Sequence, residues 1–146
     1  MAVSALDLIR IALDTAGEGR HVAVGWATIE LDRAALELAT LLGLAVDAFV
    51  SAEDCVALGG RCRVASGVLS DGLSLALLEP NTEGRLAGRL ARTGEGPAAV
   101  WTSIGGTSTR LAGARPGPFG LERLLPGGPP QGPYRLVIRG PGTIPS

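Results

Sequence analysis

The tripeptide Gly-Glu-Gly occurs twice in this chain, at residues 17–19 and 94–96, and each copy precedes a stretch of small and β-branched residues. Two apolar residues precede each tripeptide at matching offsets, namely Ile9 and Leu13 before the first and Leu86 and Leu90 before the second. The offset between the copies is 94 − 17 = 77 residues. Solenoids and propellers repeat at about 20 to 50 residues, so this longer period predicts two copies of one small α/β module packed as a pair.

The two copies differ in a residue that matters for chemistry. His21, the only histidine of the chain, begins the first of these stretches, and Ala98 stands at the matching position of the second. All 13 basic residues are arginine, which excludes Schiff-base chemistry and a P-loop lysine. Cys55 and Cys62 are the only cysteines, and they lack a second pair or a neighbouring histidine. We expect two reduced, partly buried thiols rather than a zinc site.

Composition indicates one soluble, cytoplasmic domain over residues 1–146. The chain is 46% hydrophobic, and its 13 basic and 14 acidic residues leave a net charge of −1. The basic residues are scattered rather than clustered, so we expect no nucleic-acid partner. Charged residues interrupt every apolar stretch well before the roughly 20 residues of a membrane span, and Asp7, Arg10 and Asp14 lie where a signal peptide is apolar. We therefore expect no membrane association.

The spacing of apolar residues predicts most helices and strands. Helices are expected at 5–16 with Ser4 in a capping box, from Asp32 to Gly43 with Asp32 as the cap, and at 82–93 with Asn81 or Thr82 as the cap. Strands are expected at 21–29, 61–65, 73–79, 98–104, 119–125 and 134–139. Residues 52–58 fit either a short helix or a strand.

Three stretches together resemble the vicinal oxygen chelate superfamily by their order and spacing. They are His21-Val-Ala-Val, the helix closing at Leu42-Gly43-Leu44, and the run Leu75-Ala76-Leu77-Leu78-Glu79-Pro80 ahead of the second Gly-Glu-Gly. This superfamily contains glyoxalases, methylmalonyl-CoA epimerases, extradiol dioxygenases and bleomycin-resistance proteins, and the Leu-Leu-Glu-Pro stretch looks most like the epimerase branch. The resemblance covers residues 20–104 well and 105–140 poorly.

The resemblance implies an α+β fold in which paired β-α-β-β-β modules form a curled mixed sheet around a cavity, commonly in a homodimer. Module one spans about 17–80, a linking helix spans 82–93, and a shortened module two spans about 97–140. These boundaries follow from the repeat together with the resemblance.

In catalytic members, the resemblance implies a divalent metal held by four side chains in the cavity. His21 matches the first ligand, but Ala76 and Ala99 stand where the second and third are expected, and residues 134–138 contain no acid for the fourth. Glu79 follows Ala76 by three residues and belongs to the opposite strand face, so we expect it near the start of the following helix. One imidazole does not hold a divalent ion, and we expect no metal and no cofactor.

Three residues are candidates for binding a ligand. His21 shares a strand face with small residues that border a cavity, and it serves either as a hydrogen-bonded pocket residue or as an acid or base. Trp101 is either a stacking wall for a ligand or ordinary core. Arg135, with Arg139 next to the same strand, favours an anionic ligand if it points inward and is otherwise solvated.

These residues leave three functions open. The first is a metal-independent small-molecule-binding protein of the glyoxalase/bleomycin-resistance type, taking an anionic or amphipathic ligand. The alternative is a lyase, epimerase or isomerase acting on a small carbonyl or acyl-CoA substrate, which requires a second titratable group within reach of His21. The third is a structural subunit whose cavity is filled by Trp26 and Trp101.

Overall fold

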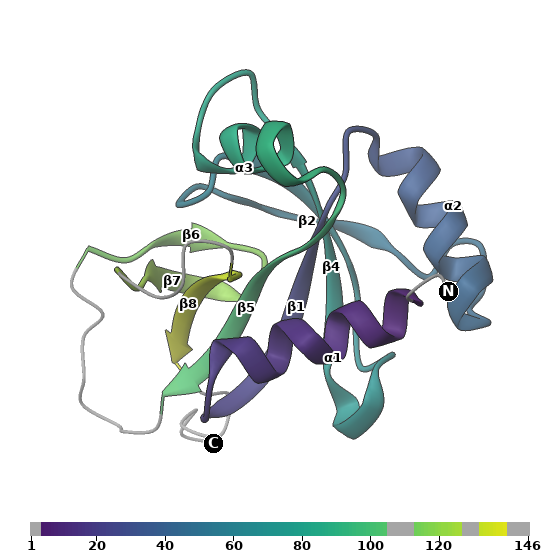
Figure 1. The fold of residues 1–146 in the computed structure, drawn as a ribbon, viewed down its shortest axis with the longest axis horizontal. Helices are drawn as coiled ribbons and strands as arrows, with labels where there is room; N and C mark the ends of the chain where they lie inside the picture. Colours follow the sequence, from purple (N-terminus) through teal and green to yellow (C-terminus); the bar gives the residue numbers. More distant parts are fainter. Residues whose placement is uncertain (1–3, 105–112, 127–131, 140–146) are drawn as a thin grey trace.

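An eight-stranded mixed sheet forms the body of the molecule (Figure 1). The computed structural model describes residues 4–104, 113–126 and 132–139. The strands are β1 (Arg20–Ala27), β2 (Val50–Cys55), β3 (Gly60–Ala65), β4 (Ser74–Pro80), β5 (Gly96–Ile104), β6 (Arg115–Gly117), β7 (Gly120–Leu124) and β8 (Tyr134–Arg139). The helices are α1 (Ala5–Ala16), α2 (Leu31–Leu42) and α3 (Arg85–Thr93), with a 3-10 turn at Ser70–Gly72.

Strand order is mirrored about the central pair of β1 and β5. The order is β2-β3-β4-β1-β5-β8-β7-β6. β1 and β5 pair antiparallel with each other, while β1 pairs in parallel with β4 and β5 pairs in parallel with β8. This arrangement confirms the predicted α+β fold of two paired modules. The connection from β5 to β6 lies mostly at 105–112, outside the described residues.

Alternation along the strands separates two apolar faces. On β1, Val24 packs with Leu75 and Leu77 of β4 beneath α2 and α1. Ala23 and Ala27 point to the other side of the sheet. Because the sheet curls, this second face encloses an inner core to which Leu86 of α3 belongs. Figure 1 shows α3 at one end of the sheet. We call the space inside the curled sheet the barrel interior.

The two edges of the sheet meet. β2 and β6 are the outermost strands, and they lie in contact with each other. The backbone N–H of Val56, just after β2, donates a hydrogen bond to the carbonyl oxygen of Pro116 in β6 at 3.3 Å. The curled sheet is therefore nearly closed. Within the described parts of the chain, no helix has the length and apolar character needed to cross a bilayer.

Most elements confirm the sequence analysis, and four details were predicted wrongly. The Ser4 hydroxyl accepts the N–H of Asp7 as expected, but α3 begins after Gly84, so neither Asn81 nor Thr82 caps it. Residues 50–55 form β2, which shows that the helical alternative for 52–58 was wrong, because pairing with β3 outweighs the local capping pattern.

The cap of α2 was also predicted wrongly. The residue before this helix, Glu30, makes no side-chain capping bond, and Asp32 lies inside the first turn and pairs with Arg63. Instead, a carboxylate oxygen of Glu79 accepts the backbone N–H of Leu31 at 3.1 Å. Glu79 thus lies at the start of α2, not of the helix that follows it, because β4 runs beside β1 and brings its end to this point.

We predict that Glu79→Ala destabilises the protein by about 1 to 2 kcal/mol, because it leaves the Leu31 N–H without its partner and also removes the ion pair with Arg61. Asp32→Ala is the matched control and should cost about 0.5 kcal/mol or less, because Asp32 is exposed and caps nothing. Urea unfolding of both variants checks this. Equal losses would contradict the assignment of the cap.

Candidate functional site

The middle of the barrel interior is lined by the smallest side chains of the sheet. Gly25 of β1 pairs with Ala76 of β4 on one side and with Ala99 of β5 on the other. Ala23, Ala76 and Ala99 are all fully buried and belong to the inner core. Small residues at these paired positions leave room for one large group above them.

The indole ring of Trp101 takes up that room. Trp101 is 0% exposed, and a Cβ added to Gly25 would lie 2.8 Å from Cζ3 of its ring. The Phe119 ring approaches it edge-on, with ring centroids 5.1 Å apart and an interplanar angle of 67°. Trp101, one of the predicted ligand-binding residues, is therefore packed into the core in this structure.

A buried carboxyl group lies beside the indole. Glu122 of β7 is 0% exposed. One of its oxygens accepts the Trp101 Nε1–H at 2.7 Å, and the other accepts the Cys55 thiol at 2.9 Å. Gly117 of β6 makes room for it, since a Cβ there would lie 1.9 Å from Oε1 of Glu122. We call Cys55, Trp101 and Glu122 the inner polar triad.

Burial governs the ionisation of this triad. Desolvation raises the pKa of Glu122, and the hydrogen bonds from Cys55 and Trp101 offset only part of that effect. Desolvation also raises the pKa of Cys55, with the Glu122 charge adding to it, and raises the pKa of Cys62 to about 12. Both thiols are free and buried, as expected, and neither has the character of a nucleophile.

Sequence reasoning missed Glu122. It belongs to the apolar stretch at 119–125, where Leu121 is exposed and Glu122 is buried, the reverse of what hydropathy favours. The usable signal was strand alternation, which places Glu122 on the same face as the inward-packed Leu124. Acidic side chains are mostly exposed, so a single acid in such a stretch is readily taken for a surface residue, and the signal was easy to overlook.

His21 lies at the start of β1, away from the inner polar triad. Its Nε2 is 2.8 Å from the carbonyl oxygen of Gly17, and its Nδ1 is 2.9 Å from the hydroxyl of Thr102. Both ring nitrogens are therefore engaged, and the side chain ties the loop after α1 to β5. Neither partner titrates near neutral pH, so the second acid or base that catalysis by His21 requires is not supplied by these contacts.

Arg135 lies on the helix-covered face of the sheet. In the pairing of β8 with β5, Arg135 is opposite Val100, which packs against α1, whereas Leu136 is opposite Trp101 and faces the interior. The guanidinium donates to the Pro126 carbonyl oxygen at 3.4 Å. The side chain of Arg139 lies outside the described residues. The structure does not bring His21, Trp101 and Arg135 together into one site.

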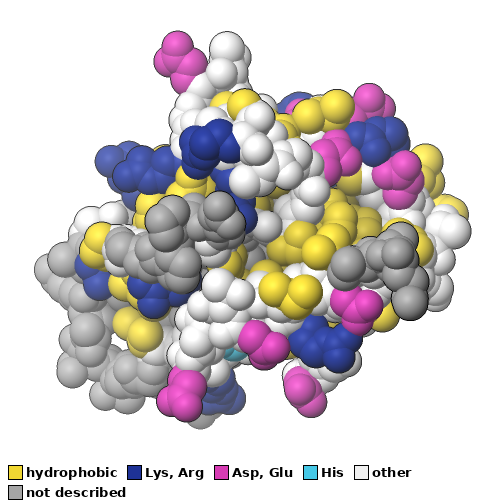
Figure 2. All heavy atoms as spheres, in the orientation of Figure 1, with side chains coloured by type: hydrophobic (Ala, Val, Ile, Leu, Met, Phe, Trp, Pro, Cys, Tyr) yellow, Lys and Arg dark blue, Asp and Glu magenta, His cyan; other side chains and the backbone are white. Residues whose placement is uncertain are grey.

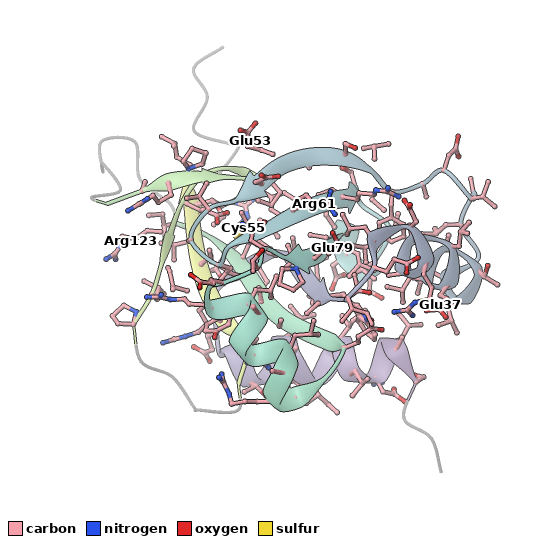
Figure 3. The ribbon with its side chains drawn as sticks, turned by 90° about the horizontal axis from the view of Figure 1, so that it is seen from above. Glu37, Glu53, Cys55, Arg61, Glu79 and Arg123 are labelled. Carbon is pink, nitrogen blue, oxygen red and sulfur yellow. The ribbon has the colours of Figure 1, made fainter. Side chains whose placement is uncertain are left out.

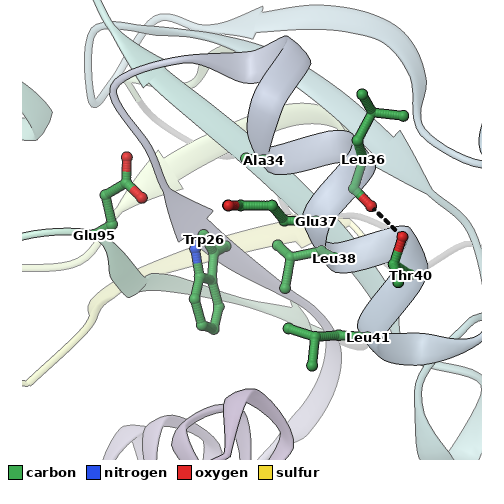
Figure 4. Close-up of a pocket in the computed structure, with 8 residues that line it drawn as sticks. All are labelled: Trp26, Ala34, Leu36, Glu37, Leu38, Thr40, Leu41 and Glu95. Carbon is green, nitrogen blue, oxygen red and sulfur yellow. Dashed lines mark hydrogen bonds between the residues drawn. The ribbon is translucent and has the colours of Figure 1, made fainter.

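A separate hollow of about 560 Å³ opens on the helix-covered face, beside Trp26. Figure 2 shows hydrophobic side chains gathered between α1 and α2, and Figure 4 shows Trp26 facing the side chains of α2. The residues that line it are Trp26, Ala34, Leu36, Glu37, Leu38, Thr40, Leu41 and Glu95. We call it the Trp26 hollow.

Charged groups form one rim of the Trp26 hollow. The Arg33 guanidinium pairs with Glu95 at 2.5 Å and with Glu37 at 2.9 Å, and the hydrogen bond to Glu95 is the main cause of the raised pKa of Arg33. Although burial works against it, the pKa of Glu95 is lowered, because Ile29 N–H, Arg33 and the Thr28 hydroxyl all donate to the carboxylate. Two carboxylates against one guanidinium leave this rim slightly acidic.

Solved structures share this arrangement. A methylmalonyl-CoA epimerase variant from Streptomyces coelicolor, in complex with 2-nitronate-propionyl-CoA, matches with a TM-score of 0.61 and 20% identity, over 84% of this chain and 98% of that one. The methylmalonyl-CoA epimerase of Mycobacterium tuberculosis matches with a TM-score of 0.58 and 18% identity, over 97% of this chain and 94% of that one. A hypothetical protein from Bacillus halodurans matches with a TM-score of 0.58 and 17% identity, over 83% of this chain and 94% of that one.

The chain has the vicinal oxygen chelate fold. No family model and no curated protein matches the sequence, so the identification rests on topology and on these structures.

The donor set of the superfamily's metal does not fit the residues present. Ala76 and Ala99 meet at Gly25, and none of the three offers a ligand atom in its side chain. Leu136 and Ile138 of β8 pack into the interior where the superfamily has an acid. Across the described ranges, no three His, Cys, Asp or Glu side chains come close enough together to hold an ion. Of the residues that the structure describes, Glu122 is the one carboxylate buried there, and both its oxygens are engaged.

We predict that divalent ions do not stabilise the protein. A Mn²⁺, Co²⁺ or Zn²⁺ site filled at about one hundred times its Kd would add about 2.7 kcal/mol, which is several degrees in Tm for a chain of this size. Thermal melts with each ion and with a chelator should coincide to within about one degree. A saturable upward shift with any of these ions would overturn our assignment of the lost ligands.

Proposed function

We propose that the protein is a metal-independent small-molecule-binding protein of the glyoxalase/bleomycin-resistance type, and that its ligand site is the Trp26 hollow. The observation that carries this proposal is an open apolar hollow with a charged rim, on a molecule whose barrel interior is packed around Trp101. In the superfamily fold, binding is thereby moved from the inside of the sheet to its helix-covered face.

The size and lining of the Trp26 hollow suit an amphipathic ligand. Its volume of about 560 Å³ lies within the roughly 300 to 1,000 Å³ of drug-sized sites. Trp26, Leu38 and Leu41 offer apolar surface, and Leu41 is 66% exposed. The rim carboxylates disfavour an anionic group there, so we propose an uncharged or weakly basic polar end beside Glu37 and Glu95.

The enzyme alternative has less support. Two structural neighbours are methylmalonyl-CoA epimerases. For a lyase, epimerase or isomerase acting on a small carbonyl or acyl-CoA substrate, His21 needs a titratable partner, and its two contacts are a backbone carbonyl and a threonine hydroxyl. We therefore place the binding protein first.

We predict that the native mass spectrum of protein purified without chelator or metal-affinity tag shows no stoichiometric metal. The same spectrum reports any retained organic molecule and counts subunits, which tests the expected homodimer. A bound divalent ion in each subunit would favour the enzyme alternative instead.

A dye titration with matched variants tests the site itself. We predict that Leu41→Ser weakens binding of Nile red, an uncharged aromatic dye, by about tenfold, because burying one leucine contributes about 1.5 to 3 kcal/mol when complete. Leu121→Ser is the control, since Leu121 is 61% exposed on β7, far from this hollow. Equal affinity of both variants and the unaltered protein would refute the Trp26 hollow as the site.

His21→Ala separates the two functions. Binding at the Trp26 hollow should be unchanged, and the variant should lose about 1 kcal/mol of stability from its contacts with Gly17 and Thr102. Loss of turnover on an acyl-CoA substrate, with the fold intact by circular dichroism, would instead support the enzyme.

A further inference from the structure

We call the contact between β2 and β6, where the sheet closes, the seam, and it has little backbone pairing. β6 is three residues long, and its Pro116 has no N–H to donate back to β2. Among the described residues, the backbone hydrogen bond across this seam runs from the Val56 N–H to the Pro116 carbonyl oxygen. Contacts below the seam must therefore contribute to holding the edges together.

The inner polar triad supplies such contacts. Glu122 lies on β7, under Gly117 of β6, and it accepts from Cys55 at the end of β2 and from Trp101 in the centre of the sheet. One carboxyl group thus links both edges of the sheet to its middle strand. Figure 3 shows Cys55 pointing inward from β2, while Glu53, two residues earlier, points outward.

We propose that the inner polar triad is a pH-dependent latch: with Glu122 protonated, its O–H and the Cys55 thiol share one hydrogen bond and the seam stays closed, and when Glu122 releases its proton to water the β6–β7 hairpin separates from β2 and opens the barrel interior. An ionised carboxylate with two hydrogen bonds in an apolar core is poorly solvated, and hydration through an opened seam relieves that cost. This proposal does not depend on the function of the Trp26 hollow.

The surroundings of Glu122 offer little to stabilise its charge. From β2 and β3 it faces the thiols of Cys55 and Cys62, and from β8 the paired residue is the apolar Ile138. Arg115 is opposite it on β6, but its side chain is exposed, and no ion pair links the two within the described chain. Burial raises the pKa of Glu122, as the latch requires.

The raised pKa of Glu122 determines whether opening increases or decreases with pH. The pKa of Glu122 is higher in the closed barrel than in an open or unfolded chain, so its contribution to closure is complete below its ordinary value. That contribution is lost as pH rises through the raised pKa. Opening should therefore increase with pH.

Thiol labelling of Cys55 measures the opening. Both cysteines are buried, so Cys62→Ala leaves Cys55 as the one thiol to be reported. The labelling rate with a disulfide reagent is divided by the rate in denaturant at the same pH, which removes the titration of the thiol itself. We expect this ratio to rise by up to about tenfold per pH unit between the ordinary pKa of a glutamate and the raised pKa of Glu122, and to level off above it.

Two further variants, both in the Cys62→Ala background, test whether the ionisation of Glu122 causes the pH dependence of the labelling ratio. Glu122→Gln keeps the size and cannot ionise, so its ratio should stay constant with pH to within about twofold. Glu53→Gln removes an exposed carboxylate from the same part of β2 and should behave like the parent. A pH-independent parent, or the same pH dependence in Glu122→Gln, would overturn the latch.

Hydrogen exchange on the unaltered chain keeps the proposal testable if Glu122→Gln fails to fold. After correction for intrinsic exchange, protection should fall with pH in peptides covering 113–124 and remain constant in peptides covering β4. Parallel behaviour of the two regions would show that no local opening occurs and would overturn the latch.

Discussion

The antiparallel pairing of β1 with β5 is the contact on which the rest of the structure depends. It joins the two modules, and it sets the register that places Gly25 opposite Ala99 and beside Ala76. Because these side chains are small, the sheet curls tightly enough for Trp101 to fill the space above Gly25. A methyl group at Gly25 would clash with both this ring and Leu78. The pairing of β1 with β5 and the packing of the interior therefore constrain each other.

This packing shows how the fold is stable with small apolar residues where the resemblance implies metal ligands. In a site built around an ion, the interior carries several polar side chains, and removing the ion leaves them unpaired. Here alanine and glycine replace them, and the remaining carboxyl, Glu122, is paired with an indole and a thiol. Among the described residues, no buried polar side-chain atom lacks a hydrogen-bond partner. The interior around Trp101 is thus packed as a core.

The sequence sufficed for most helices and strands because capping and alternation are local signals, whereas the curled sheet was implied by the resemblance to the superfamily. The Ser4 cap, the glycine that ends α2 in the left-handed region and the alternation of β4 each depend on a few neighbouring residues. Glu79 at the start of α2 and Glu122 beside Trp101 depend on residues 48 and 21 positions away. Such contacts follow from strand register, which the sequence pattern leaves undetermined by a few residues.

The two acids that sequence reasoning misplaced or missed divide the molecule's polar chemistry between its two faces. Glu79, together with Glu95, satisfies backbone N–H groups at the start of α2, which holds that helix over Trp26 and shapes the hollow between them. On the inner face of the sheet, Glu122 connects the two edges through its hydrogen bonds with Cys55 and Trp101. An ion pair or a helix start tolerates a hydrated charge, whereas the interior does not. A rise in pH should therefore act on the seam, where burial raises the pKa of Glu122, rather than on the hollow, where hydrogen bonds lower the pKa of Glu95.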